Sequence, residues 1–284
     1  MLFINKQEDL DEVCKIVELS DVMSIDTEFL RRDTYFPKLS IIQIKTNDCQ
    51  IIIDSLSDLD LLPFKNLLLN DKILKIFHAP REDLFIFYNL FKILPKNIFD
   101  TQIAARICKL GDSLSYSDLC YEISGVHIDK TYQKADWIKR PIAPDMLNYA
   151  MQDVEYLENI YKILYETMKK DNLHTAYQNK ISTLLDTKNY IINPKKILSR
   201  IKFQNHSEDF ILRMEIFVTY REECAMQLDL PRQHFITDQE LVKICQYLPV
   251  SQEDLNKLNF NNKYLNKPKH KNQLFDLCLG FNEI

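Results

Sequence analysis

The chain has 284 residues, of which 46% are hydrophobic and 27% charged, and its net charge is −5 at pH 7. Its length and composition are typical of a soluble globular protein with two domains, and no apolar run approaches the ~18–20 residues that cross a bilayer. The N-terminus turns acidic within a few residues and does not resemble a signal peptide. The seven cysteines are scattered without a C-x-x-C pair, which indicates neither a zinc ribbon nor a disulfide framework and favours a reducing cytoplasm.

Glycine is rare, and no glycine-rich phosphate-binding motif occurs among the three glycines of the chain. Any phosphate chemistry would therefore need another device, such as metal ions. The charge is unevenly distributed, because residues 1–170 hold 21 basic and 27 acidic side chains, whereas residues 193–280 hold 13 and 11. Bound divalent cations would offset part of the acidic excess in the first region.

The first 170 residues alternate patterns typical of strands and helices. After a helical pattern at 9–20 come three neighbouring runs rich in Ile and Val, which predict an antiparallel meander. Patterns of both kinds follow, so this region is a mixed α/β layer. The meander strands are expected at 22–29, 39–45 and 50–54, a further strand at 73–78, and helices at 58–69, 80–91, 100–110, 115–125 and 143–170.

The pattern loosens at 171–192, and only helical patterns follow, at 209–228, 237–248 and 251–258. We therefore expect an α/β domain over 1–170, a connecting segment over 171–192, and a small all-helical domain over 193–284. The stretch NNKYLNKPKHKN, residues 261–272, is interpreted as an exposed basic loop. It is either a solvated linker or a contact for nucleic acid.

Two carboxylates, Asp26 and Glu28, stand at the end of the first meander strand. Residues two apart in a strand face the same side of the sheet. Their mutual repulsion costs free energy unless a cation lies between them. The alternative is an ordinary solvated pair at a strand end.

Two later segments supply further acids. HAPREDL, residues 78–84, runs from a strand into a helix and places Asp83 in a first turn, where the helix dipole favours an acid. NYAMQDVEYL, residues 148–157, places Tyr149 and Asp153 one turn apart on one helical face. That face is partly apolar, so the pKa of Asp153 would be raised unless a cation lay nearby. Common first-turn acids and a simple amphipathic helix are the alternatives.

The four acids Asp26, Glu28, Asp83 and Asp153 together suit Mg²⁺ or Mn²⁺ better than zinc, because no cluster of His or Cys accompanies them. Two such ions ~3.5–4 Å apart stabilise both the attacking and the leaving oxygen of an in-line phosphoryl displacement. Tyr149 would position the attacking water, since a phenol with a pKa of ~10 is a poor base at neutral pH.

These segments, in this order, resemble the motifs of the DEDD superfamily of 3′→5′ exonucleases, and they match the ribonuclease D family closely. DTEFLRRDTYFPKLSIIQI resembles the first motif, HAPREDL the second and NYAMQDVEYL the third, and DWIKRPI, at 136–142, resembles the segment upstream of the third. Tyr149, four residues before Asp153, is typical of the tyrosine branch. LDLPRQHFITDQELVKIC, residues 228–245, resembles an HRDC domain.

The resemblance implies a ribonuclease H-like mixed sheet flanked by helices, the DEDD exonuclease fold, followed by a small all-α HRDC-like domain. It implies that Asp26, Glu28 and Asp153 hold one ion, that Asp26 bridges to a second ion, and that Asp83 acts on the second. His78 is expected to make a structural hydrogen bond. The expected substrate contacts are Arg31, Arg32, Lys134 and Arg140 with phosphates and Trp137 with a base, although Trp137 fits core packing equally well.

The implied function is that of a cytoplasmic, monomeric 3′→5′ exoribonuclease without membrane contact. With two Mg²⁺ or Mn²⁺ ions it would release nucleoside 5′-monophosphates from RNA 3′ ends, such as those of tRNA precursors and small structured RNAs. The residues by themselves support only phosphodiester hydrolysis with two metals. The alternatives are a DNA 3′→5′ exonuclease of the same superfamily, against which the lack of a polymerase or helicase region argues, and an RNA-binding module with an inactive nuclease site, against which the complete set of acids argues.

Overall fold

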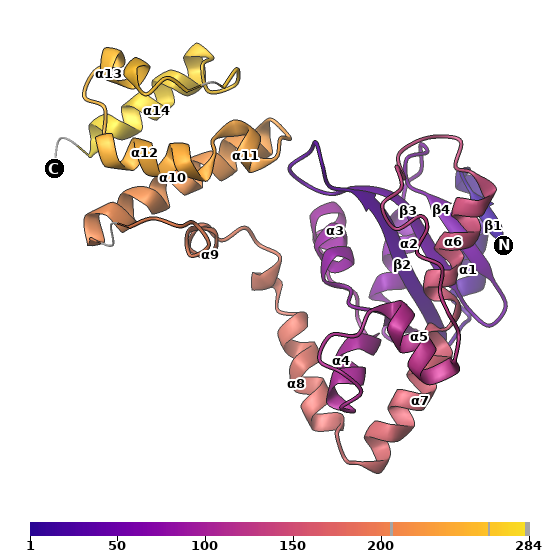
Figure 1. Ribbon diagram of the computed structural model, residues 1–284. Helices are drawn as coiled ribbons and strands as arrows, with labels where there is room; N and C mark the ends of the chain where they lie inside the picture. The colour runs from indigo at the N-terminus through magenta and orange to yellow at the C-terminus, as the bar shows by residue number, and fades with distance from the viewer. Residues whose placement is uncertain (205–206, 261, 282–284) are drawn as a thin grey trace. The chain divides into compact units, whose positions relative to one another are not determined.

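Figure 1 shows a computed structural model of the protein, which describes residues 1–204, 207–260 and 262–281. The chain forms two compact units. The sheet unit comprises Met1–Leu30 and Pro37–Ile191, and the helical unit comprises Arg31–Phe36 and the chain from Ile192 onward. The last three residues of the predicted domain 193–284 lie outside the described ranges, and the functional assignment of the predicted domains stays a prediction. Within the described ranges, no helix is long and apolar enough to cross a membrane.

The sheet unit is built on one mixed sheet of six strands in the order β1-β4-β3-β2-β5-β6. Strands β2, β3 and β4 form the predicted antiparallel meander, and the remaining pairs are parallel. The sequence pattern does not predict the edge strands β1 and β6, because three residues are too few to show alternation. The strands are β1 (Leu2–Ile4), β2 (Val22–Leu30), β3 (Lys38–Lys45), β4 (Gln50–Asp54), β5 (Leu74–Phe77) and β6 (Ile98–Asp100).

Helices cover this sheet and complete the mixed α/β layer expected from the sequence. The isoleucines of β3 and β4 are almost fully buried, as near-continuous apolar runs are in strands covered on both faces. Figure 1 shows α6 running beside β2 and β3, and it packs against β2, β3 and β4. The helices of this unit are α1 (Gln7–Val17), α2 (Leu62–Leu69), α3 (Arg81–Phe91), α4 (Thr101–Ile107), α5 (Tyr116–Ser124), α6 (Pro144–Glu155), α7 (Leu157–Lys170) and α8 (His174–Leu184).

The single helix expected over 143–170 is two helices, α6 and α7, that meet at Tyr156. The hydroxyl of Tyr116 donates to the carbonyl of Gln152, at 2.8 Å, and accepts from the backbone N–H of Tyr156, at 3.1 Å. These are the two groups that would pair with each other in a continuous helix. The inserted hydroxyl therefore breaks the helical ladder, which the periodicity of the sequence does not reveal.

Segment 171–192, interpreted as a connection, contains a packed helix of the sheet unit. Tyr177 and Ile181 of α8 are buried, and α8 packs against α4 and β6. The Tyr177 hydroxyl accepts a hydrogen bond of 2.8 Å from the backbone N–H of Asp100. Only the short 3₁₀ turn Thr187–Asn189 and its flanks remain as connecting chain.

The helical unit is all-helical, as predicted, with helices close to each predicted position. A capping box formed by Thr237 and Glu240 begins α12. The predicted basic loop is only partly a loop, because Pro268 begins α14, whose residues His270, Leu274 and Cys278 form a buried stripe. The helices are α9 (Pro194–Leu198), α10 (Glu208–Gln227), α11 (Arg232–Phe235), α12 (Asp238–Tyr247), α13 (Gln252–Lys257) and α14 (Pro268–Gly280).

Candidate active site

Strand β2 carries the first two candidate ligands on one face. Asp26 lies directly opposite Gln43 of β3, and Glu28 lies opposite Ile41. A bulge follows Glu28, where the register shifts between Glu28 and Phe29. Bulges commonly re-aim side chains next to functional sites, and this one shifts the register immediately after the second acid, with pairing resumed at Phe29 and Leu30.

Helix α6 brings the third acid to the same face. Carboxylate oxygens of Asp26, Glu28 and Asp153 all lie within 4.8 Å of one another, and the three side chains are half-buried. This distance suits oxygen ligands around one divalent cation. The family resemblance implied these three acids as the ligands of one ion, and the fold brings them together from two elements more than 110 residues apart in the chain.

The fourth acid, Asp83, stands beside this group without being part of it. It lies in the first turn of α3, which follows β5, the strand paired with β2 on the side away from β3. Asp83 is 7% exposed and accepts a short hydrogen bond from the hydroxyl of Thr27. Because Thr27 is the residue between Asp26 and Glu28, its hydroxyl ties the second motif to the first.

The four acids hold their protons more tightly than ordinary carboxyls do, because burial and the neighbouring negative charges disfavour the charged form. Burial, followed by the charges of Asp153 and Asp83, raises the pKa of Glu28 to about 9. Burial also raises the pKa of Asp153 to about 7 and of Asp83 to about 6. The pKa of Asp26 lies well above its usual range, because of burial and the charges of Asp83, Asp153 and Glu28.

Among the described residues, no lysine or arginine forms an ion pair with any of these four acids. A group of oxygen donors that lacks a protein cation fits Mg²⁺ or Mn²⁺, which favour carboxylates over nitrogen and sulfur ligands. The donor set therefore fits the divalent cations expected from the sequence, and it leaves the choice between the two open.

Tyr149 lies on α6 one turn before Asp153 and is 6% exposed. Its ring packs edge-on against Tyr132, with ring centres 5.8 Å apart, and against Trp137 at 6.1 Å. Burial and the nearby charges of Asp153, Glu28 and Asp26 raise its pKa above the usual value. The phenol therefore keeps its proton at neutral pH and can donate a hydrogen bond, as positioning a water requires.

His78 makes the structural contacts that its sequence position predicted. Its Nδ1 lies 2.9 Å from the Thr101 hydroxyl, and its Nε2 lies 3.1 Å from the Leu114 carbonyl. Burial lowers the pKa of His78 to about 4, so the ring is neutral. Its ring also packs against that of Tyr116, the residue that separates α6 from α7.

Two of the five predicted substrate contacts are placed in structural roles. Trp137 is 2% exposed, and its ring lies against Tyr149, so the structure favours core packing over base stacking. The Arg140 guanidinium is engaged with Asp54 at 2.6 and 2.9 Å and with the oxygens of Ser40 and Trp137. These contacts pin the DWIKRPI segment to the sheet through β3 and β4.

The other three predicted contacts are exposed cations. Lys134 lies at the surface of the sheet unit, whereas Arg31 and Arg32 belong to the segment Arg31–Phe36 of the helical unit. Arg32 pairs with the neighbouring Asp33 at 3.1 Å, and both side chains are well exposed. Such an exposed pair contributes little to stability, so it leaves Arg32 able to meet a phosphate.

Sequence reasoning missed Thr27 and Gln43 at this site. Thr27 carries no signal beyond standing between two acids. Gln43 does carry one, because it is a polar residue between isoleucines in the run IIQI of β3. Gln43 is fully buried, and neither atom of its amide has a hydrogen-bond partner among the described residues.

Comparisons with known proteins agree with this geometry. A family model described as 3′-5′ exonuclease matches residues 1–169. The ribonuclease D of Bartonella henselae is 35% identical over 268 residues, which cover 94% of this chain and 66% of that protein. The ribonuclease D of Nitrobacter hamburgensis is 33% identical over 257 residues, which cover 90% and 67%. The chain thus spans about two thirds of the length of these curated relatives.

The crystal structure of Escherichia coli RNase D, described as an exoribonuclease involved in structured RNA processing, superimposes with a TM-score of 0.89. The two proteins are 26% identical, and the match covers 99% of this chain and 75% of the other. The expected fold class is confirmed, since the mixed six-stranded sheet matches that structure and the C-terminal helical region fits an HRDC-like domain. The chain belongs to the ribonuclease D family of 3′-5′ exonucleases.

Proposed function

We propose that this protein is a metal-dependent 3′→5′ exoribonuclease. The observation that carries the proposal is the group formed by Asp26, Glu28 and Asp153, with ligand oxygens within 4.8 Å and Asp83 beside it. Membership of the ribonuclease D family supports RNA as the substrate. The HRDC-like helical unit supports it as well, because this unit has a basic stretch around α14.

Asp26, Glu28 and Asp153 would hold one divalent cation, and Asp26 and Asp83 would hold the second. When bound, such ions supply Lewis acidity toward the scissile phosphate and lower the pKa of a bound water. Thr27 keeps the Asp83 carboxylate in place through its hydroxyl. The ring contacts of Tyr149 with Tyr132 and Trp137 fix the direction of its side chain.

The reaction is an attack of water on the phosphorus of the last phosphodiester bond. The bond between phosphorus and the 3′ oxygen breaks, so the released nucleotide keeps its 5′-phosphate and the shortened RNA ends in a 3′-hydroxyl. Tyr149 would donate a hydrogen bond that orients the attacking water, because burial and the neighbouring carboxylates raise its pKa and favour the protonated phenol. Arg31, Arg32 and Lys134 would contact phosphates of the RNA.

The substrates we propose are tRNA precursors and other small structured RNAs. The support is that the Escherichia coli relative takes part in structured RNA processing. We also propose that the protein acts as a monomer and that it works in the cytoplasm. The seven free cysteines are consistent with a reducing compartment of that kind.

One digestion series tests the proposal. RNA and DNA oligonucleotides of one sequence, labelled at either end, are incubated with the protein in Mg²⁺, Mn²⁺ or EDTA. We expect nucleoside 5′-monophosphates from the 3′ end of RNA with either metal and none in EDTA. Faster digestion of DNA than of RNA would replace the proposal with a DNA exonuclease, and digestion in EDTA would contradict the metal site.

Tyr149→Phe tests the positioning role separately. We expect a fall in kcat of roughly 10²-fold, because a misplaced nucleophile loses most of its orientation advantage, with unchanged affinity for Mn²⁺. Tyr165→Phe, on α7, is the matched control. An unchanged kcat in the Tyr149 variant would remove the hydroxyl from the mechanism.

A further inference from the structure

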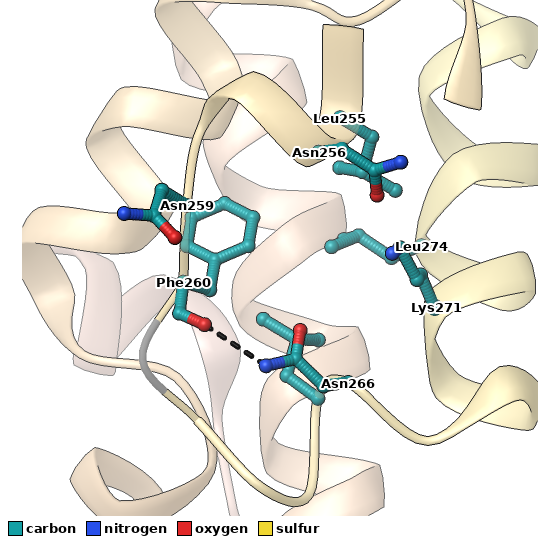
Figure 2. Close-up of a pocket in the computed structure, with 8 residues that line it drawn as sticks. Leu255, Asn256, Asn259, Phe260, Asn266, Lys271 and Leu274 are labelled. Atoms are coloured by element: carbon teal, nitrogen blue, oxygen red, sulfur yellow. Dashed lines mark hydrogen bonds between the residues drawn. The ribbon is translucent and has the colours of Figure 1, made fainter. Parts of the chain in front are cut away.

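A small pocket of about 200 Å³ lies in the helical unit, between α13, α14 and the chain that joins them (Figure 2). Its floor is apolar, and its rim carries amides and one ammonium group. The floor residues Leu255, Phe260, Leu265 and Leu274 are each at most 9% exposed. The rim residues are Asn256, Asn259, Asn266 and Lys271.

The amides of the rim are mostly unused by the fold. Asn266 donates its Nδ2 to the carbonyl of Phe260 at 3.0 Å, which holds the loop and leaves its own Oδ1 available (Figure 2). The side chains of Asn256 and Asn259 make no hydrogen bond with another described residue. An amide offers both a donor and an acceptor, so this rim can pair with the mixed edge of a nucleobase.

The surroundings of the pocket are basic. Residues 255–275 include five lysines and no acidic residue. Lys257 pairs with Asp254 at 3.0 Å, and Lys263 and Lys267 lie over the ring of Tyr264. Of the remaining two lysines, Lys271 lines the pocket. Within this range, the sequence pattern of residues 261–272 allowed either a solvated linker or a contact for nucleic acid. The positive charge of the stretch complements a phosphate backbone.

We propose that this pocket binds one unpaired base of RNA and that Lys271 contacts a phosphate next to that base. Its volume is below the roughly 300–1,000 Å³ of sites for drug-sized ligands, which suits a single flat ring system. Proteins read RNA chiefly through unstacked bases whose edges are hydrogen-bonded. The proposal rests on the exoribonuclease function, because it gives a second grip on the same substrate.

The test measures binding of a short single-stranded RNA by fluorescence anisotropy, in a full-length Asp153→Asn background that does not degrade the probe. We expect Asn256→Ala and Lys271→Ala each to weaken binding about five- to tenfold. Lys271→Ala should also reduce the slope of log K against log salt by about 0.7, the value for one phosphate contact on a single strand. Asn256→Ala should leave that slope unchanged and have no effect on an oligonucleotide of abasic nucleotides.

Asn272→Ala, on α14 outside the pocket, and Lys180→Ala, on α8, are the matched controls. Pocket variants that bind as tightly as these controls would overturn the proposal, as would an equal loss with abasic RNA. Digestion of a dinucleotide by the same variants with Asp153 restored separates this failure from that of the main function. A chain that digests no RNA at all would refute the exoribonuclease, whereas normal digestion with unchanged binding would refute only the pocket.

An independent observation concerns Gln43. It lies opposite Asp26 in the antiparallel pair of β2 and β3, so both side chains face α6. It is fully buried, and both polar atoms of its amide lack a partner among the described residues. A buried amide without partners opposes folding, and its strand neighbours are isoleucines. An apolar residue would therefore suit the fold better at this position.

We infer that Gln43 is a positioning residue for Asp26. Side chains directly opposite each other in such a pair have Cβ atoms about 4.5–5.5 Å apart, which is within reach of the glutamine amide. With a cation held by Asp26, the Gln43 Nε2 would donate to the Asp26 carboxylate, directly or through a water, and so fix its orientation. Residues that oppose folding locally are typically kept where function needs them.

Gln43→Met, which keeps the length of the side chain and removes the amide, separates the two roles. Without metal we expect its melting temperature to equal or exceed that of the unchanged protein, while its affinity for Mn²⁺, followed by electron paramagnetic resonance without RNA, falls about tenfold. Gln50→Met on β4 is the control, because that amide already donates to Glu155 at 2.8 Å. It should lower the melting temperature and leave Mn²⁺ affinity unchanged.

Unchanged Mn²⁺ affinity in Gln43→Met would overturn this inference. A clear loss of metal-free stability would overturn it as well, because it would show that the amide serves the fold. If Gln43→Met does not fold, Gln43→Leu gives the same two readouts with a different apolar shape.

Discussion

Two groups of buried acids, one in each unit, differ in how their charge is balanced. In the helical unit, Glu222 is 1% exposed and is surrounded by donors: Arg221 and Arg232, each at 3.2 Å, and the Tyr35 hydroxyl at 2.6 Å. Arg221 is itself fully buried and also pairs with Asp238 at 2.6 Å. This group carries its own cations.

For the group at the candidate active site, the ion pairs found among the described residues include none with these acids. Its four acids face one another, and the pKa of each is raised. A buried acid whose cation comes from the chain is part of the fold, whereas a buried acid without one favours binding a cation from solution. Charge balance alone therefore distinguishes a structural cluster from a binding site, and variants of each group test this difference.

The largest expected effect is on hydrolysis. Asp153→Asn replaces a carboxylate ligand with a neutral amide and should lower kcat by at least 10³-fold, because two-metal chemistry depends on the complete ligand set. Its metal-free melting temperature should stay equal or rise, since one repelling charge is lost. The measurement is RNA digestion in Mn²⁺ together with thermal unfolding in EDTA. Asp145→Asn, in the first turn of the same helix, is the control, and equal kcat in both variants would sink the site assignment.

The second effect is on the stability of the helical unit. Glu222→Gln removes the buried charge that Arg221 and Arg232 share, although Arg221 keeps its pair with Asp238, and we expect a loss of about 3 kcal/mol in the free energy of unfolding. The neighbouring Glu223→Gln on α10 is exposed and should change it by less than about 0.5 kcal/mol. Urea unfolding of the full chain, followed by circular dichroism, measures both. If Glu222→Gln were as stable as the unchanged protein, the charge of Glu222 would not be needed to balance the buried arginines.

The third effect is a pH dependence of the sheet unit without metal. Folded pKa values of about 7 for Asp153 and about 9 for Glu28 exceed the ~3.9–4.3 of unfolded carboxyls. The folded state therefore binds more protons than the unfolded state, and stability decreases as pH rises through 6.5–8. We expect a fall in melting temperature on the order of 5 °C over this range in EDTA.

Excess Mg²⁺ should remove most of that fall, because it replaces the protons. In Asp153→Asn the slope in EDTA should be shallower. A metal-free melting temperature that rises between pH 6.5 and 8, or one that Mg²⁺ leaves unchanged, would contradict the account of the site as a set of unbalanced acids.

The smallest expected effect concerns Tyr35, the residue of the Arg31–Phe36 segment that is buried in the helical unit. Tyr35→Phe removes the hydrogen bond to Glu222 but leaves both arginine pairs, so a loss of about 1–2 kcal/mol is expected. Tyr247→Phe, which is 68% exposed, is the control for urea unfolding. Equal stability of the two variants would show that the arginines alone balance Glu222.

The candidate site could be predicted from the sequence to the extent that it rests on local motifs. The order and spacing of DTE, HAPREDL and NYAMQDVEYL predicted all four acids and Tyr149, and the structure brings three of the acids within 4.8 Å. The meander was equally predictable, because its strands are long and rich in Ile and Val. A family motif and a strand pattern are both properties of neighbouring residues.

The roles of Trp137 and Arg140 could not be predicted in the same way. Their types suit nucleic acid as well as the core, and only the packing of their segment against β3 and β4 decides between the two. The break between α6 and α7 depends likewise on Tyr116, 40 residues upstream of Tyr156. Such outcomes depend on partners from distant parts of the chain.

The letters of the chain were enough to predict the candidate ligands, because the ligand types and their spacing are fixed within short segments. Only the tertiary structure decided which charges are neutralised. Glu222 and Asp153 are both acids on helices. Arg221 stands beside Glu222 in the sequence, but the contacts of Glu222 with Arg232 and Tyr35 come from other parts of the chain and are seen only in the fold. Charge balance is set by side chains that folding brings together, and at this site it left a place for a cation.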